Sequence, residues 1–186
     1  MSNRYTVAVA RGWRSFLALT YAAVTPITLL AFVTNVTFAQ QIVIDGRTET
    51  SLAIDGHVTD VTTETVQGNN AFNSFHRFDV DRGNVVNLHL PGGSTNLINV
   101  VRSERTDIHG VLNSIQDGHI GGNVYFANPH GIVVGAGGIV NVGSLVLTTP
   151  SQQFADELIP ANGIPSNPAT EQLLDGTAVH DGNSVI

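Results

Sequence analysis

Seven histidines are the side chains of this 186-residue sequence best suited to binding a metal ion. They are spread singly, and none forms a His-x-x-x-His pair or a His-Glu-x-x-His motif, the spacings that bring two ligands together on a helix. The sequence has no cysteine, which excludes a thiol nucleophile, a disulfide and a cysteine zinc site. We therefore expect no metal site and no cofactor. The histidines are His57, His76, His89, His109, His119, His130 and His180.

Asp79 and Asp81 form an acid pair whose spacing could serve catalysis, because alternate residues of a strand share a face and glycosidases use paired carboxylates. An Arg-Gly turn follows the pair directly, so we expect both carboxylates to be solvated. Beyond the first 39 residues the chain has one tyrosine and neither lysine nor tryptophan. This composition offers little for a carbohydrate-binding cleft, and no catalytic residue is predicted. A β-helical enzyme acting on polysaccharide remains an alternative.

The N-terminal part of the sequence has the layout of a secretory signal peptide. Three arginines lie within the first fourteen residues, residues 16–38 are mostly apolar, and a small residue stands at the exit. We predict a signal peptide over residues 1–39, cleaved between Ala39 and Gln40. An uncleaved membrane anchor is the alternative, because the apolar run is long enough to span a bilayer, although Pro26 interrupts it. In both cases the rest of the chain leaves the cytoplasm.

The remaining residues, 40–186, form an acidic body. They hold five arginines against fifteen aspartates and glutamates, a formal charge of −10. Proteins that grip nucleic acid through its phosphates need a basic patch, so no nucleic acid is expected as a partner. The whole chain has 19 glycines and 12% charged residues, about half of the roughly 25% usual in globular proteins. This composition favours a turn-rich β protein.

Short segments of alternating apolar and polar residues predict β-strands throughout the body. In residues 86–90, Val86, Leu88 and Leu90 alternate with Asn87 and His89. An antiparallel sandwich or barrel and a parallel β-helix both fit such segments. Similar alternation places four further pairs on shared faces: Leu52 with Ile54, Val124 with Phe126, Val140 with Val142, and Leu145 with Leu147.

The glycine corners favour the parallel β-helix. Residues 131–135 and 138–143 are very short apolar segments, joined by small residues without a hairpin turn. Asp45-Gly46, Asp55-Gly56 and Asp117-Gly118 permit hairpins elsewhere. The expected fold is all-β, with stacked coils and antiparallel pieces near the start that cover the edge of the first coil.

Two short helices are expected after residue 148. Thr149 would cap the first, ahead of Pro150 at its first position, with Phe154 and Leu158 on one face. Asn167-Pro168 would begin the second in the same way, ahead of two leucines.

Two longer motifs resemble those of filamentous-haemagglutinin-like exoproteins. Residues 70–80, Asn-Ala-Phe-Asn-Ser-Phe-His-Arg-Phe-Asp-Val, are similar to the N-terminal motif of that family. Residues 123–135, which contain Asn-Pro-His-Gly-Ile, are similar to its second motif. Between them, residues 108–112 and 117–122 resemble its coil repeats. On these motifs the chain is identified as a member of the two-partner secretion domains, and the leukotoxin-like filamentous adhesins are the branch that it most resembles.

The resemblance implies a right-handed parallel β-helix with an N-terminal cap and short antiparallel extensions. It implies a non-catalytic export module of a large secreted bacterial adhesin of the haemagglutination type. A dedicated outer-membrane β-barrel transporter with soluble periplasmic domains would recognise the module. The exoprotein would cross the periplasm to the cell surface or the medium, where regions absent here could bind host or bacterial surfaces. The front end of a contact-dependent toxin carrier has the same domain and is the alternative.

The sequence departs from the family pattern in three places. Residues 88–93 stand where the family often has an Asn-Pro-Asn-Leu motif, and His130 replaces the usual asparagine of the second motif. Histidine, like asparagine, tolerates left-handed backbone, so the second turn is expected to survive. The chain also stops before the family's domain is normally complete. We therefore expect residues 40–186 to be a secretion domain with an incomplete C-terminus.

The second motif supplies four candidate site residues at one corner. Pro129 fixes the backbone, and the Asn128 side chain can close the turn by accepting a hydrogen bond from the amide two residues on. Gly131 permits a left-handed position, and Ile132 re-enters the core. We expect these residues to serve either the fold or recognition by the transporter.

The first motif supplies the other candidates, with the same two possible roles. Its phenylalanines are three residues apart, which strand alternation does not produce, so a turn or bulge must intervene. Large rings of this kind fill cores, whereas an exposed edge of the same segment could bind the transporter by β-augmentation. The candidates are Asn70, Phe72, Asn73, Phe75 and Phe78.

Overall fold

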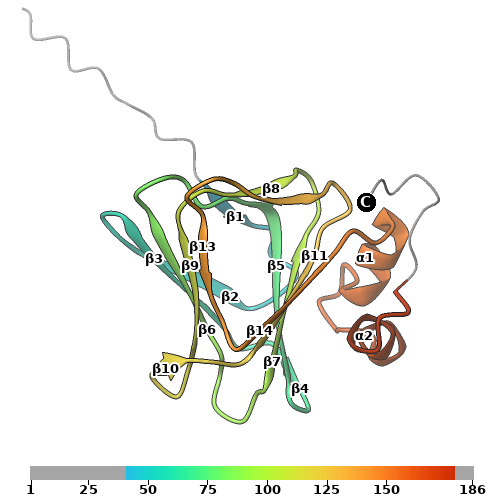
Figure 1. Ribbon diagram of the computed structural model, residues 1–186. Coiled ribbons are helices and arrows are strands. Elements are labelled where there is room, and N and C mark those ends of the chain that lie inside the picture. The colour runs from blue at the N-terminus through green and yellow to red at the C-terminus, as the bar shows by residue number, and fades with distance from the viewer. Residues whose placement is uncertain (1–40, 179–186) are drawn as a thin grey trace, which may run out of the picture. The chain divides into compact units, whose positions relative to one another are not determined.

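The computed structural model describes residues 41–178. The predicted signal peptide, with its cleavage point between Ala39 and Gln40, lies outside the described residues. Fourteen strands and two helices are found in the described range (Figure 1). None of the helices there is long and apolar enough to cross a membrane.

The strands form three sheets that wrap around one interior (Figure 1). In spatial order, the first sheet contains β1 (Ile42–Ile44), β5 (Asn70–Phe78), β7 (Asn96–Val101), β11 (Asn123–Ala127) and β14 (Ser144–Thr148), with β4 (Val66–Gln67) also on β5. The second contains β10 (His119–Ile120), β9 (Val111–Gln116), β6 (Val85–His89), β3 (Val58–Thr63) and β2 (Thr50–Asp55), with β13 (Ile139–Asn141) also on β9. The third contains β12 (Ile132–Val134) and β8 (Thr106–Ile108).

The chain passes repeatedly through the first, third and second sheets and pairs with its own previous coil. Asn70 pairs with Asn96 and Asn96 with Asn123, always in parallel. In the second sheet, β6 pairs in parallel with β3, β9 with β6, and β13 with β9. The third sheet begins with the parallel bridge between Val80 and Ile108. The result is a β-solenoid of about three turns, which confirms the predicted parallel β-helix.

The interior of the solenoid is filled by the apolar residues of the alternating segments. Val86, Leu88, Val124 and Phe126 are all buried there, as the alternation predicts. Ile54, by contrast, is 63% exposed, because it lies near the tip of a hairpin. Leu145 and Leu147 on β14 are also exposed, because within the described residues β14 has a strand neighbour on one edge only.

Antiparallel strands cap the N-terminal edge, as expected. β1 pairs with β5, and β2 with β3, so neither sheet starts with an exposed parallel strand. Two of the three predicted hairpin turns are confirmed: Gly56 lies between β2 and β3, and Asp117-Gly118 between β9 and β10. Asp117 and Gly118 both have positive φ, 51° and 79°, as a tight two-residue hairpin requires. Asp45-Gly46 forms no hairpin, because β1 before it belongs to the first sheet and β2 after it belongs to the second.

Two helices follow the last strand, α1 (Gln152–Leu158) and α2 (Asn167–Leu174). Their existence is confirmed, but the predicted caps are wrong by one or two residues. Ser151 caps α1 by accepting a hydrogen bond from the Phe154 amide, and Ser166 caps α2 in the same way. A serine hydroxyl reaches the exposed amides of the first turn from the position just before it.

Candidate functional site

Most of the first motif, residues 70–80, lies on β5, which stands between β1 and β7 in the first sheet. Phe72, Phe75 and Phe78 are all fully buried, but on different faces. Phe75 and Phe78 fill the solenoid interior, where Phe78 also stacks edge-to-face on Phe126 at 5.1 Å between ring centroids. Phe72 faces outward and is covered by α1 and α2. The irregularity predicted from the spacing is present, because the pairing of β1 with β5 shifts at His76.

Asn73 places an amide inside the apolar interior, where it is fully buried. Its Oδ1 accepts a hydrogen bond from the Thr50 hydroxyl at 2.9 Å, and its Nδ2 donates to Asn99 Oδ1 at 3.0 Å. Asn99 donates in turn to the Tyr125 carbonyl at 3.2 Å. A buried amide must be paired to be tolerated, and this chain of bonds ties the cap to two successive coils.

Two ladders of side-chain hydrogen bonds, which the sequence reasoning missed, run along the outside of the solenoid. In the first-sheet ladder, Asn96 Nδ2 donates to Asn70 Oδ1 at 2.7 Å, Asn123 Nδ2 donates to Asn96 Oδ1 at 2.9 Å, and Ser144 Oγ donates to Asn123 Oδ1 at 2.8 Å. Asn70 therefore serves as the first acceptor of a ladder. Every bond points from a later coil to an earlier one.

The second-sheet ladder has the same direction but begins with a carboxylate. Asn141 donates to Asn113, Asn113 to Asn87, and Asn87 Nδ2 to Asp60 Oδ1 at 2.9 Å. His89 Nε2 also lies 2.8 Å from Asp60 Oδ1. The hydrogen bonds from His89 and Asn87 hold the pKa of Asp60 below its ordinary value. Asparagines recurring every 26 to 28 residues are the sequence signal that could have revealed this ladder.

The second motif forms the corner between β11 and β12. Asn128 is fully buried, and its Oδ1 accepts a hydrogen bond from the His130 amide at 2.8 Å, the turn closure expected from the sequence. Its Nδ2 reaches back to the previous coil, donating to the Glu104 carbonyl at 2.9 Å and to Thr106 Oγ1 at 3.0 Å. The Asn128 side chain thus joins one corner to the corner beneath it.

The other residues of this corner also have structural contacts. Gly131 has φ = +97°, which favours glycine, and its carbonyl accepts a hydrogen bond from the Thr106 amide. Ile132 packs against the solenoid interior, and Pro129 lies in the turn between Asn128 and Gly131. His130, the departure from the family pattern, places Nε2 2.8 Å from the Arg102 carbonyl.

The two members of the acid pair, Asp79 and Asp81, lie in different surroundings. Asp79 is buried, not solvated as expected, because it accepts hydrogen bonds from Arg77 Nε at 2.6 Å and from the Asp107 amide at 2.9 Å. Asp79 also raises the pKa of Arg77. Asp81 is exposed and bonds to Gln41. Within residues 41–178, no group of three or more histidine, aspartate or glutamate side chains is placed to hold a metal ion.

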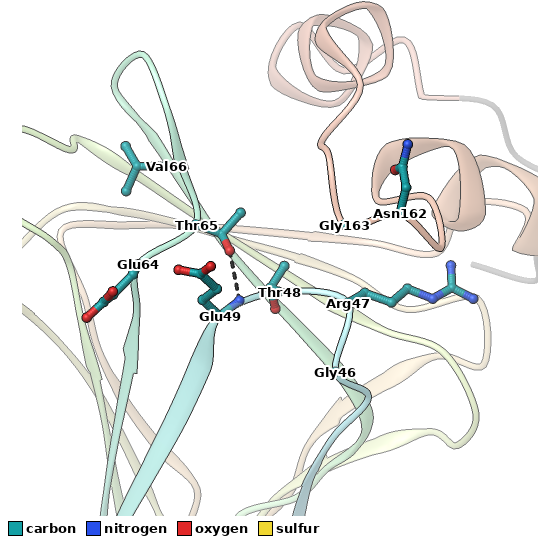
Figure 2. Close-up of a pocket in the computed structure, with 9 residues that line it drawn as sticks. All are labelled: Gly46, Arg47, Thr48, Glu49, Glu64, Thr65, Val66, Asn162 and Gly163. Carbon is teal, nitrogen blue, oxygen red and sulfur yellow. Dashed lines mark hydrogen bonds between the residues drawn. The ribbon is translucent and has the colours of Figure 1, made fainter.

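A depression of about 430 Å³ lies beside the cap (Figure 2). It contains two carboxylates, Glu49 and Glu64, and one arginine, Arg47, which is itself bonded to Asp156. The Glu49 backbone amide donates a hydrogen bond to Thr65 Oγ1 among the residues that line it (Figure 2). The lining of the depression is mostly polar, and its one arginine is already paired with Asp156.

Comparison with known proteins gives two matches. The TPS secretion domain family matches residues 40–164, which include the cap and all the stacked coils. The heme/hemopexin-binding protein of Haemophilus influenzae is 30% identical over 112 residues. That alignment covers 60% of this chain and 11% of the relative, so the chain spans about a tenth of the length of the curated relative that it matches.

Proposed function

The chain belongs to the TPS secretion domain family, and from this premise we propose that it is the export module of a secreted bacterial adhesin, recognised by a dedicated outer-membrane β-barrel transporter. Two-partner secretion substrates cross the outer membrane to the cell surface or the medium. The observation that carries the proposal is the family match over residues 40–164, because it coincides with the solenoid and its cap. The module itself is proposed to be non-catalytic.

We propose that the transporter's soluble periplasmic domains bind the folded module along β2. Among the described strands, β2 pairs only with β3, on one edge, and the three residues of β2 that follow Leu52, including Ile54, are all exposed. An open strand edge can accept a further strand, whose main-chain hydrogen bonds supply the affinity. The phenylalanines of the first motif are fully buried, so recognition through their rings would require an unfolded chain.

A secretion assay with the cognate transporter tests the β2 edge. A lysine on an edge strand opposes the addition of another strand, so Ile54→Lys should reduce secretion several-fold without lowering the melting temperature. Ile164→Lys is the matched control, because Ile164 is 64% exposed against 63% for Ile54 but lies far along the chain, between α1 and α2. Equal secretion of the two variants would contradict recognition at β2.

For the Asn128 corner we propose a role in folding. Asn128→Ala removes one turn closure and two bonds to the previous coil, and Gly131→Val places a branched side chain at positive φ. Each change should lower stability by about 1–3 kcal/mol, and secretion should fall only in proportion. Melting temperature and secretion must be measured on the same variants. Lost secretion with an unshifted melting curve would instead favour direct contact with the transporter.

A further inference from the structure

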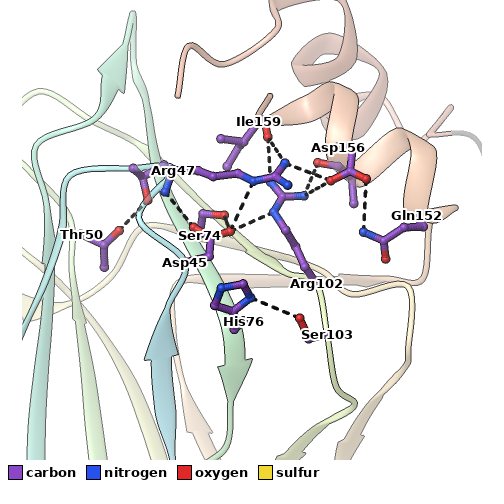
Figure 3. A network of polar contacts seen from close by, with 12 residues as sticks. Asp45, Arg47, Thr50, Ser74, His76, Arg102, Ser103, Gln152, Asp156 and Ile159 are labelled. Carbon is purple, nitrogen blue, oxygen red and sulfur yellow. Dashed lines mark hydrogen bonds and ion pairs between the residues drawn. The ribbon is translucent and has the colours of Figure 1, made fainter. Parts of the chain in front are cut away.

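The turn that follows β1 contains Asp45 and Arg47, and we call it the N-terminal turn. A cluster of charged groups lies where this turn, the end of β7 and α1 meet (Figure 3). Asp45 and Arg102 are at its centre, with side chains 0% and 4% exposed. Arg102 Nε donates to Asp45 Oδ2 at 3.0 Å, and the Ser74 hydroxyl donates to the same oxygen at 2.6 Å. Asp45 Oδ1 accepts from the Arg47 amide at 2.9 Å. Both carboxylate oxygens are therefore used, as a buried charge requires.

The remaining nitrogens of Arg102 are turned toward α1. Nη1 donates to the Ala155 carbonyl at 2.7 Å and lies 3.3 Å from Asp156 Oδ1, and Nη2 donates to the Ile159 carbonyl at 2.9 Å. Arg47 Nη1 donates to Asp156 and to the same Ile159 carbonyl (Figure 3). Two arginines thus satisfy carbonyls at the C-terminal end of a helix, where cations are favoured. The two aspartates balance their charge.

Apolar contacts make up most of the remaining described packing of residues 151–178, which we call the arm, against the coils. Phe154, Leu158 and Leu173 cover an outward apolar face of the first sheet that includes Phe72 and Ile98. No strand of the described chain lies in the arm, and all the described hydrogen bonds between the arm and residues 41–148 are donated by Arg47 and Arg102. The coils, by contrast, are joined to one another by main-chain ladders.

We infer that the arm is a latch: a separately opening unit that closes over the finished coils and is locked to the N-terminal turn by the Arg47–Arg102–Asp156 contacts. The docking surface of the arm is made by β5, β7 and β11, so it exists only when these strands are stacked on one another. The bond from Arg47 to Asp156 joins residues 109 positions apart. Closing the latch therefore ties the last part of the described chain to the first.

Amide hydrogen exchange in the full chain tests the latch through Asp156→Asn, which removes the charge that both arginines share. We expect the Thr170 and Asp175 amides, which are hydrogen-bonded within α2, to exchange at least about 10-fold faster, because a short helix is unstable once undocked. Amides of β9 and β11 should change less than about twofold. Asp156 is 46% exposed, so the variant should fold.

Glu157→Gln is the matched control, since it removes a neighbouring negative charge of the same helix that makes no contact in the cluster. A second variant, Arg47→Gln, should reproduce the effect of Asp156→Asn from the other side of the contact. Equal acceleration of arm and strand amides would show that the arm and the coils open as one unit, and would overturn the inference. Exchange in Asp156→Asn no faster than in Glu157→Gln would overturn it as well.

Discussion

In the coils, each asparagine of a ladder repeats the contact made by the one before it, whereas the arm is attached through one cluster of charges that occurs once. Ladder bonds such as Asn113 to Asn87 join neutral amides at half-buried positions on the outside of the solenoid. The arm is fixed by Arg102, whose guanidinium is almost fully buried and makes four contacts, to two aspartates and two carbonyls.

This difference decides how the stability of each region responds to a substitution that removes one contact. A neutral hydrogen bond contributes about 1 kcal/mol net, and its loss in one coil leaves the other coils paired. Removing one member of a buried charge pair leaves the other without a partner, which is far more costly. Burial already lowers the pKa of the Arg102 guanidinium, and the nearby Arg47 acts in the same direction, so the cluster depends on its aspartates.

The largest effect is expected for Arg102→Met. The substitution takes the guanidinium away from the buried Asp45 carboxylate and removes one donor from each of two helix-end carbonyls. We expect a loss of about 3–5 kcal/mol in the free energy of unfolding, measured by urea denaturation. Arg105→Met is the control, because Arg105 forms an exposed pair with Asp107 and should cost less than about 1 kcal/mol. Similar losses in the two variants would mean that the cluster does not lock the arm.

The coils were the predictable part of the molecule, because the sequence patterns that specify them are local and periodic. Alternation identified the buried faces of β6 and β11 through residues such as Leu88 and Phe126, and the Asp117-Gly118 dipeptide marked a hairpin. The corner at Asn128 was likewise predictable, because a side chain that closes a turn acts within two residues. The ladders were missed because alternation treats Asn87 and Asn113 only as outward polar residues. Their partners become visible only when successive coils are aligned.

The cluster at Arg102 could not be predicted from local patterns. The contacts of Arg102 join residues 53 to 57 positions apart, with no motif at either end. The burial of Asp79 was missed for the same reason, since a turn-forming sequence gives no sign that Asp107 from the next coil will donate a hydrogen bond to it. Non-repeated polar contacts between distant segments depend on the finished packing of the coils.

A smaller effect is expected inside a ladder for Asn113→Asp. Asn113 Nδ2 donates to Asn87, and a carboxylate at this position would instead face the Asn87 oxygen with no proton to share. We expect a loss of about 1–2 kcal/mol at pH 7, measured by urea denaturation. The new carboxyl should have a raised pKa in the folded state, so the loss should shrink as the pH falls and the group becomes protonated.

Asp60→Asn is the control for this variant, because Asp60 is the first acceptor of its ladder and donates to no earlier coil. An amide oxygen can still accept the bond from Asn87, so this change should be nearly neutral at pH 7. If Asn113→Asp proves as mild as Asp60→Asn, the ladder has no preferred direction and each position could tolerate either group.

The smallest effect is the pH dependence contributed by Asp60 itself. Hydrogen bonds from His89 and Asn87 lower its pKa in the folded state below the ordinary aspartate value of 3.8. An acid with a lowered pKa stabilises the fold above its unfolded pKa, and that contribution is lost as the pH falls through the folded value. The loss of stability should therefore begin below about pH 4. Solvent limits this loss to roughly 0.5 kcal/mol or less, because the Asp60 side chain is 42% exposed.

Urea denaturation of the native chain and of Asp60→Asn between pH 6 and pH 2 measures the difference. The two stability curves should run in parallel above pH 5 and converge or cross below pH 4. A separation that stays constant to pH 2 would show that the bonds to Asp60 do not favour its charged form, and that the carboxylate at the start of this ladder has no advantage over an amide.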